Sequence, residues 1–173
     1  MSIYAFEDKI PDVSQDAFVH PEAVLIGDVV IEKRCFIGPG AVIRADAGPV
    51  VIREGTSVQD NVIIHVDPGS EAIIEKNVVV GHGAILHDVH IGQECVIGMG
   101  AILMPGVVCG EGAFVGAGSL VPSRMNIPPG KLVTGNPAKI IRDVTPDQAS
   151  YAREGVQFYS ELADRYKDAM RKI

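Results

Sequence analysis

Three histidines lie close together in this sequence and have the chemistry of metal ligands: His65, His82 and His87. Neutral imidazole is a common ligand of Zn²⁺, and a catalytic zinc site is typically built from three protein ligands and one open position. An ion in such a site lowers the pKa of its bound water to about 7 and so supplies hydroxide at neutral pH. The alternative is that these are ordinary histidines in solvated turns. The elements that carry them decide which of them can meet.

The histidines lie within a six-residue repeat that extends over most of the chain. A small side chain stands two positions before each aliphatic residue, so the two point to the same side of a short extended strand. Fixed-period self-similarity of this kind is typical of a solenoid. The repeated positions are Val19, Leu25, Ile31, Ile37, Ile43, Ile52, Val58, Ile64, Ile74, Val80, Leu86, Ile91, Ile97, Leu103, Cys109, Val115 and Val121.

This pattern resembles the hexapeptide-repeat proteins, in which three short strands per coil form a triangular prism. The resemblance covers residues 12–140 and implies an all-β solenoid, a left-handed parallel β-helix with a C-terminal α-helix. Spacing alone does not give the hand, since crossover connections are ordinarily right-handed. We expect one domain, with an N-terminal edge strand and turn at residues 1–16, the β-helix at 17–140 and a helix at 145–172 packed on it.

The C-terminal helix has clear local signals. Thr145 is a good N-cap, with Pro146 at the first helical position and Asp147 in the first turn. Gly155 weakens the middle of the segment. An apolar stripe predicts packing along a prism face or on a neighbouring subunit. It consists of Ala149, Ala152, Val156, Tyr159, Ala163, Tyr166 and Met170.

Composition excludes several classes of function. The chain has 173 residues, 47% of them hydrophobic but only 5% aromatic, which suits a narrow prism filled by aliphatic side chains. The net charge of −7 argues against a nucleic-acid partner. No secretory leader or membrane-spanning run is visible, so we expect a cytoplasmic protein without a membrane partner. All three cysteines, Cys35, Cys95 and Cys109, occupy inward positions and are interpreted as core residues.

The period of the repeat places the histidines on the corners of the prism. His65 and His87 occupy equivalent positions of the first corner in successive coils, and are expected about 5 Å apart, the spacing of neighbouring strands. His82 belongs to the third corner. A site that uses all three must therefore form between chains. In a homotrimer, each site would take His65 and His87 from one chain and His82 from its neighbour.

Polar residues accompany the histidines on the same two corners. Arg44 lies on the first corner one coil before His65, whereas Gln59 and Asp60 lie on the third. Arg44 facing Asp60 of a neighbour would form an ion pair that sets the register of assembly. Asp46 could bind the same arginine or hold a histidine Nδ1–H. Gln59 has both a donor and an acceptor and could orient hydroxide or CO₂. The alternative for this set is a solvated turn.

The ordered set of motifs resembles the γ-class carbonic anhydrases and their relatives from phenylacetate-degradation and carnitine operons. The resemblance implies a Zn²⁺ site, with Fe²⁺ or Co²⁺ as alternatives, held by three histidines across a trimer interface. It also implies reversible hydration of CO₂ to bicarbonate by metal-bound hydroxide. The residues that carry it are Arg44-x-Asp46, Gln59-Asp60, His65, Gly81-His82 and His87; the metal ligands would be the histidines, and the catalytic group Gln59, Asp60, Arg44 and Asp46.

The sequence departs from this family where protons are transferred. Ala47 stands where the best-known active members carry a glutamate, and the acidic loop after the first metal histidine is replaced by the short segment 66–70. Asp67 and Glu71 are the candidate substitutes. Low hydration activity is therefore expected.

Two other classes of function stay open. An acyl-CoA thioesterase or a hexapeptide acyltransferase could use the same interface, and the segment Gly135-Asn136-Pro137-Ala138-Lys139 occurs in many acyltransferases. Three histidines at metal spacing argue against a plain acyltransferase, which needs only one. The third reading is a non-enzymatic assembly subunit that has kept only the scaffold.

Overall fold

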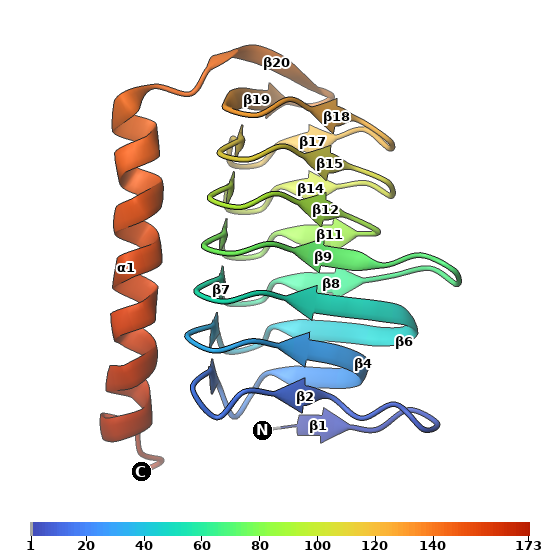
Figure 1. Cartoon of the computed structure of the whole chain (residues 1–173), viewed down its shortest axis with the longest axis vertical. Helices are drawn as coiled ribbons and strands as arrows, with labels where there is room; N and C mark the ends of the chain where they lie inside the picture. Colours follow the sequence, from blue (N-terminus) through green and yellow to red (C-terminus); the bar gives the residue numbers. More distant parts are fainter. Residues whose placement is uncertain (1) are drawn as a thin grey trace.

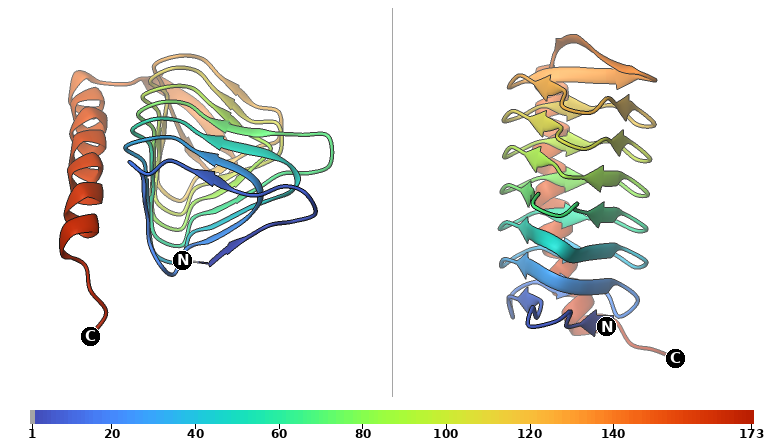
Figure 2. Two further views of the ribbon diagram at one scale, coloured as in Figure 1. Left: turned by 60° about the horizontal axis from the view of Figure 1, so that its bottom comes forward. Right: turned by 90° about the vertical axis from the view of Figure 1, so that its right-hand side faces the viewer.

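The computed structural model describes residues 2–173 and contains a parallel β-helix with one long helix along its side (Figure 1). Short strands stack in successive coils, and each coil turns through the three faces of a triangular prism (Figure 2). The predicted fold class, a left-handed β-helix of hexapeptide repeats with a C-terminal α-helix, is confirmed. Among residues 2–173, no helix is long and apolar enough to cross a bilayer.

The strands align in three columns, which define the faces. The first face contains β1 (Ser2–Tyr4), the first halves of β4 (Val24–Ile31) and β6 (Val42–Ile52), then β8 (Ile63–His65), β11 (Ile85–His87), β14 (Ile102–Leu103) and β17 (Leu120–Val121). The second contains β2 (Asp12–Val13), the second halves of β4 and β6, then β9 (Ala72–Ile74), β12 (His90–Ile91), β15 (Val108–Cys109) and β18 (Asn126–Ile127). The third contains β3 (Phe18–Val19), β5 (Phe36–Ile37), β7 (Ser57–Val58), β10 (Val79–Val80), β13 (Val96–Ile97), β16 (Phe114–Val115) and β19 (Lys131–Gly135).

The core is the stack of inward aliphatic side chains. The largest fully buried side chains come from the repeated positions and from Ile127, which continues the six-residue spacing after Val121. Together with the smaller buried residues they form one continuous cluster. A strand of two or three residues cannot bury its inward side chains alone, so stability comes from stacking coil on coil. The three cysteines lie in this core, as predicted. Burial raises the pKa of the Cys35 and Cys95 thiols to about 12, which makes them inert core side chains.

Both ends of the prism differ in detail from the sequence-based boundaries. At the N-terminus, β1 and β2 both pair in parallel with β4, so the segment expected as an edge strand and turn supplies two sides of the first coil. At the other end, β19 pairs with β20 (Ala138–Asp143) in the antiparallel sense. The expected end of the β-helix at residue 140 thus falls inside β20.

Helix α1 (Pro146–Ala169) begins at a capping box in which the Thr145 side chain accepts from the Gln148 N–H and the Gln148 side chain accepts from the Thr145 N–H. The helix continues through Gly155 without a break and ends before residue 172, the predicted limit. It packs on the third face of its own prism, where Phe18 and Phe36 contact Tyr159 and Tyr166. Figure 2 shows α1 running along one side of the stacked coils.

Candidate metal centre

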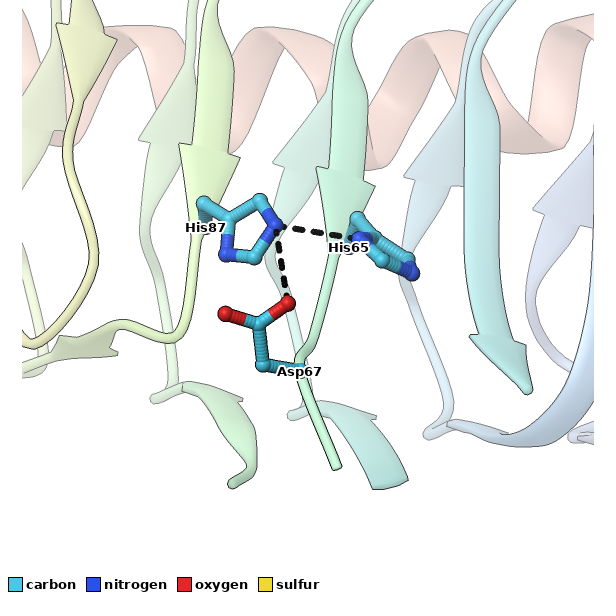
Figure 3. Close-up of side chains that lie close together, drawn as sticks. All are labelled: His65, Asp67 and His87. Atoms are coloured by element: carbon cyan, nitrogen blue, oxygen red, sulfur yellow. Dashed lines mark hydrogen bonds and ion pairs between the residues drawn. The ribbon is translucent and has the colours of Figure 1, made fainter. Parts of the chain in front are cut away.

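Two of the three histidines meet at the end of the first face. Strands β8 and β11 pair in parallel with His87 opposite His65, the alignment that the repeat predicted. The imidazole rings are 4.9 Å apart between centroids, and His65 Nδ1 lies 3.0 Å from His87 Nε2 (Figure 3). Two nitrogens that bind one tetrahedral zinc ion lie about 3.4 Å apart. A small rotation of either ring would therefore let both nitrogens reach one ion.

Asp67 is a third potential ligand on the same chain. Its Oδ1 lies 3.8 Å from His87 Nε2, and one ligand atom from each of His65, Asp67 and His87 lies within 4.8 Å of the others (Figure 3). The Asp67 side chain is 60% exposed. It extends from the segment that follows β8, the place where the sequence suggested a substitute for an acidic loop.

Asp46 supports His65 from the side away from this pair. Its Oδ1 lies 3.2 Å from His65 Nε2, and its Oδ2 accepts a hydrogen bond of 2.7 Å from Arg44 Nη1. Desolvation of Asp46 opposes ionisation, but the hydrogen bonds from Arg44 and His65 outweigh it and lower the pKa of the carboxyl. Asp46 therefore holds the Nε2–H of His65, and not the Nδ1–H expected from the sequence, so Nδ1 is the nitrogen that faces His87.

Asp88 stands in a similar place behind His87. Its Oδ2 lies 3.2 Å from His87 Nδ1, although the angles are not those of a hydrogen bond, and this buried nitrogen has no hydrogen-bond partner. Asp88 Oδ1 accepts from the Asp67 N–H at 2.8 Å. The carboxylate is thus fixed close to the histidine. Sequence reasoning missed Asp88, and the available signal was its position directly after His87 in a shortened repeat.

His82 lies on the corner between the third and first faces. Its Nδ1 is 3.0 Å from Asp60 Oδ2, so Nε2 is the ring nitrogen that does not have this carboxylate beside it. Gly81 permits the close stacking at this corner, because a Cβ there would lie only 2.7 Å from the Met99 backbone nitrogen. Each of the three histidines therefore has a carboxylate near one ring nitrogen and a second nitrogen available, an arrangement typical of metal-binding histidine. The donor set fits a divalent transition metal.

Gln59 is fixed beside His82. The side chain is 5% exposed, and its Oε1 accepts from the His82 N–H at 3.1 Å. This bond uses one of the two lone pairs of the amide oxygen and fixes the orientation of the amide beside His82. The sequence suggested both a donor and an acceptor here.

One chain does not bring the whole predicted set together. Within residues 2–173, the group that could hold a metal contains His65, Asp67 and His87 but lacks His82. Arg44 pairs with Asp46 and Asp60 lies beside His82, so the Arg44–Asp60 pair expected between chains has no counterpart within one chain. The remaining histidines stand apart. His20 accepts from the Glu22 N–H, and His90 is exposed near Glu75.

The two halves of the histidine set lie on opposite edges of the first face. His82 precedes β11, and His87 ends it. Between these edges, the outward side chains of the face are aliphatic, and helix α1 covers the third face instead. Ile63 and Ile85 are 43% and 37% exposed. The outward aliphatic column consists of Val24, Val42, Ile63, Ile85, Ile102 and Leu120.

Comparison with known proteins shows that this chain is similar to hexapeptide-repeat proteins. The family described as "Bacterial transferase hexapeptide (six repeats)" matches residues 12–45 and 88–123. The carnitine operon protein CaiE of Salmonella agona is 39% identical over 170 residues, which is 98% of this chain and 86% of that protein. CaiE of Escherichia coli K12 is 40% identical over 165 residues, or 95% and 84% of the two chains.

Two solved structures match this chain over nearly its full length. A proposed acetyltransferase of Bacillus cereus superposes with a TM-score of 0.96 at 38% identity and covers 98% of both chains. A hexapeptide transferase family protein from Anaplasma phagocytophilum gives a TM-score of 0.92 at 34% identity, over 95% of this chain and 98% of that one.

Proposed function

Because the chain belongs to the hexapeptide-repeat family that includes the carnitine operon proteins CaiE, we propose that it is a metal-dependent enzyme of the γ-class carbonic anhydrase type, which hydrates CO₂ reversibly at sites between the subunits of a homotrimer. The observation that carries this proposal is the position of the histidines. A pair whose facing ring nitrogens are in hydrogen-bond contact at 3.0 Å lies on one edge of an apolar face, and a single histidine lies on the other edge.

Threefold symmetry brings these edges together. When three prisms stand with their first faces toward a common axis, the edge that ends one first face meets the edge that begins the next. The exposed aliphatic side chains would then be buried at the centre of the trimer, where burial of apolar area favours association. At each junction, His65 and His87 of one chain would face His82 of its neighbour. Arg44 and Asp60 would approach each other in the same way, on the same two edges.

The carboxylates beside His65 and His82 indicate which ring nitrogens would bind the ion. Asp46 is hydrogen-bonded to His65 Nε2, and Asp60 Oδ2 lies 3.0 Å from His82 Nδ1. The atoms that would bind the ion are therefore His65 Nδ1 and His87 Nε2, which now face each other at 3.0 Å, and His82 Nε2 of the neighbouring subunit. Zn²⁺ suits three imidazoles and an open position, and Fe²⁺ or Co²⁺ could take the same ligands. When bound, the ion lowers the pKa of a coordinated water and so supplies hydroxide near neutral pH.

The remaining polar residues bind and orient in this proposal. The Gln59 NH₂ group would donate to an oxygen of CO₂ or bicarbonate, because its own oxygen is held by the His82 N–H. Arg44 would keep Asp46 ionised and in place behind His65. Asp67, exposed and 3.8 Å from His87 Nε2, is the group placed to pass protons to buffer. With one exposed carboxylate in place of an acidic loop, hydration is expected to be slow.

Acyl transfer is the second candidate, and the near-complete superposition on a proposed acetyltransferase favours it. A transferase would use one histidine as a base and would need no metal. The two functions therefore differ in whether turnover depends on an ion.

Metal analysis of the purified full chain, followed by stopped-flow CO₂ hydration with and without chelator, tests the proposal. We expect about one divalent ion per chain in a homotrimer, and hydration that is lost with the metal and restored with Zn²⁺, Fe²⁺ or Co²⁺. Metal-free protein that transfers acetyl groups from acetyl-CoA at the same rate as untreated protein would refute it in favour of the second candidate.

A further inference from the structure

A cavity of about 630 Å³ lies between helix α1 and the corner of the prism that carries His82. Cavities of about 300–1,000 Å³ take small organic molecules. The walls of this one are rich in aromatic rings. The chain has only five phenylalanines and four tyrosines, and four of these nine residues line the cavity: Phe114, Tyr151, Phe158 and Tyr159. Such a concentration in a chain that is 5% aromatic indicates a ligand that aromatic rings recognise.

Two of these rings are not needed to pack the helix on the prism. Tyr151 and Phe158 are 64% and 53% exposed, and other residues of α1 make the contacts with the third face. The two lie two turns apart on the same side of the helix. Gly155, between them, also lines the cavity, and a Cβ there would lie 3.4 Å from Val79 Cγ2. Without a longer side chain at this position, both rings stay accessible to a ligand.

The rings of Phe158 and Tyr159 stand almost at right angles. Their centroids are 5.3 Å apart and their planes make an angle of 88°. Perpendicular rings form the walls of an aromatic cage, in which ring faces with partial negative charge surround a cation. Met99 lines the same cavity and adds a polarisable thioether. These side chains therefore suit an organic cation with an apolar surface.

The charges on the helix side also favour a cation. Glu154 lines the cavity and lies one turn from both Tyr151 and Phe158. Its Oε1 accepts a hydrogen bond of 3.0 Å from Ser150 Oγ, which fixes the carboxylate. Within residues 2–173, the lining contains no lysine or arginine. A cation bound beside the rings would thus have one counter-charge and no like charge on the helix.

The prism side of the cavity carries negative charge as well. Asp60 lies 3.0 Å from the Nδ1 atom of His82, which lines the cavity. Burial, and after it the charge of Asp60, raise the pKa of the Tyr159 phenol. The Asp60 carboxylate therefore acts on a ring that lines the cavity, and an anionic ligand would be repelled from both sides.

We propose that this cavity binds a quaternary ammonium group, with its alkyl groups against the rings of Tyr151 and Phe158 and with Glu154 as the counter-charge. Such a cation has no N–H donors, so ring faces and one carboxylate are sufficient to recognise it. A primary ammonium would need acceptors for three donors. The inference goes beyond the proposed function, because it needs neither an ion nor turnover.

Choline and its neutral isostere 3,3-dimethyl-1-butanol give the decisive comparison, because they differ only in the replacement of nitrogen by carbon. Proton NMR titrations against the full-length protein measure both affinities. Choline should bind at least about tenfold more tightly, and the rings should shift its N-methyl signal upfield. A cavity that is merely apolar would bind the isostere as tightly as choline or more tightly, since burial of a charge is costly. That result would overturn the proposal.

Three variants locate the group. Glu154→Gln and Phe158→Leu should each weaken choline binding at least about fivefold and leave the isostere nearly unchanged. Both positions are exposed, so folding should be preserved. Glu161→Gln is the matched control and should have no effect, because Glu161 is also exposed on α1 and also accepts from the side chain four residues before it. Equal choline affinity in all three variants would refute the assignment.

The state of the metal separates this inference from the proposed function. The cavity is lined by residues of a single chain, so choline should bind before and after chelation. Choline binding by a protein that holds no metal would support the cation site and remove the metal mechanism. Metal-dependent CO₂ hydration by a protein that does not bind choline would do the reverse.

Discussion

Mixed trimers give a direct test of a metal centre shared between chains. His65→Ala chains keep His82, and His82→Ala chains keep the pair of His65 and His87, which lies within 3.0 Å on one chain. Each variant alone should form metal-free trimers. At each junction of a mixed trimer, the pair comes from one chain and the single histidine from the next. A junction is therefore complete where a His82→Ala chain supplies the pair and a His65→Ala chain supplies His82.

The expected stoichiometry follows from counting junctions. In a cyclic trimer with two chains of one variant and one of the other, one of three junctions has an intact pair facing an intact His82. If each variant carries its own affinity tag, trimers that carry both tags should thus bind about one ion each. A random mixture of equal amounts of the two variants, without this selection, should hold about a quarter of the wild-type metal content. Inductively coupled plasma mass spectrometry after tandem purification measures both values.

The matched control mixes His65→Ala with His87→Ala. Because the register pairs these two residues on adjacent strands of one chain, no junction regains a full set, and no metal should return. Metal in this control, or none in the mixture of His65→Ala and His82→Ala, would refute the assignment of ligands to chains.

Three other changes test the carboxylate behind His65, the trimer interface and the packing of α1 on the prism. Asp46→Asn should weaken metal affinity about 10–100-fold, measured by competition with a chelator. In the folded protein the pKa of Asp46 lies below the ordinary value of 3.8, so the ionised carboxylate contributes its full stability above pH 3.8 and loses it only as the pH falls through the lowered pKa. The free energies of unfolding of wild type and variant, measured by urea denaturation, should therefore become equal only in strong acid. Equal values already near pH 6 would show that the Asp46 carboxylate does not stabilise the fold in this way. Ile85→Asp should dissociate the trimer into single chains of 18.4 kDa, measured by light scattering. The control Val108→Asp changes a residue of similar exposure on the second face and should leave the trimer intact. A trimer in both variants would exclude the first face as the interface. Gly155→Ala should stabilise α1 by about 0.8–1 kcal/mol, which is roughly 2–4 °C in Tm by calorimetry, and a lower Tm would mean that Val79 cannot accommodate the added methyl.

The sequence predicted the arrangement of the coils better than the contacts between side chains. A strict six-residue period fixes which corner a residue occupies, so the pairing of His65 with His87 and the separation of His82 could be counted. The hand of the coil came from family resemblance, because a repeat length carries no chirality. In contrast, the orientation of the Gln59 amide depends on its contact with the His82 N–H, which the repeat does not predict.

Contacts with the C-terminal helix were the least predictable from the sequence. The apolar stripe indicated packing but left open whether its partner was the same prism or another subunit, and only the three-dimensional structure places α1 against the third face. The cavity follows from that placement. Gly155 looked like a weak point in the helix, whereas in the structure it lines an opening beside His82.

The path of α1 changes how the solenoid can unfold. Repeat proteins usually have nearest-neighbour energetics, so terminal coils fray independently of the rest. Here the last element of the chain returns along the prism to the first coils (Figure 1). There the rings of Tyr166 and Phe18 lie 5.1 Å apart between centroids. Opening of the earliest coil must therefore also release the end of the polypeptide, which links fraying at the two termini and makes a linear array behave as one cooperative unit.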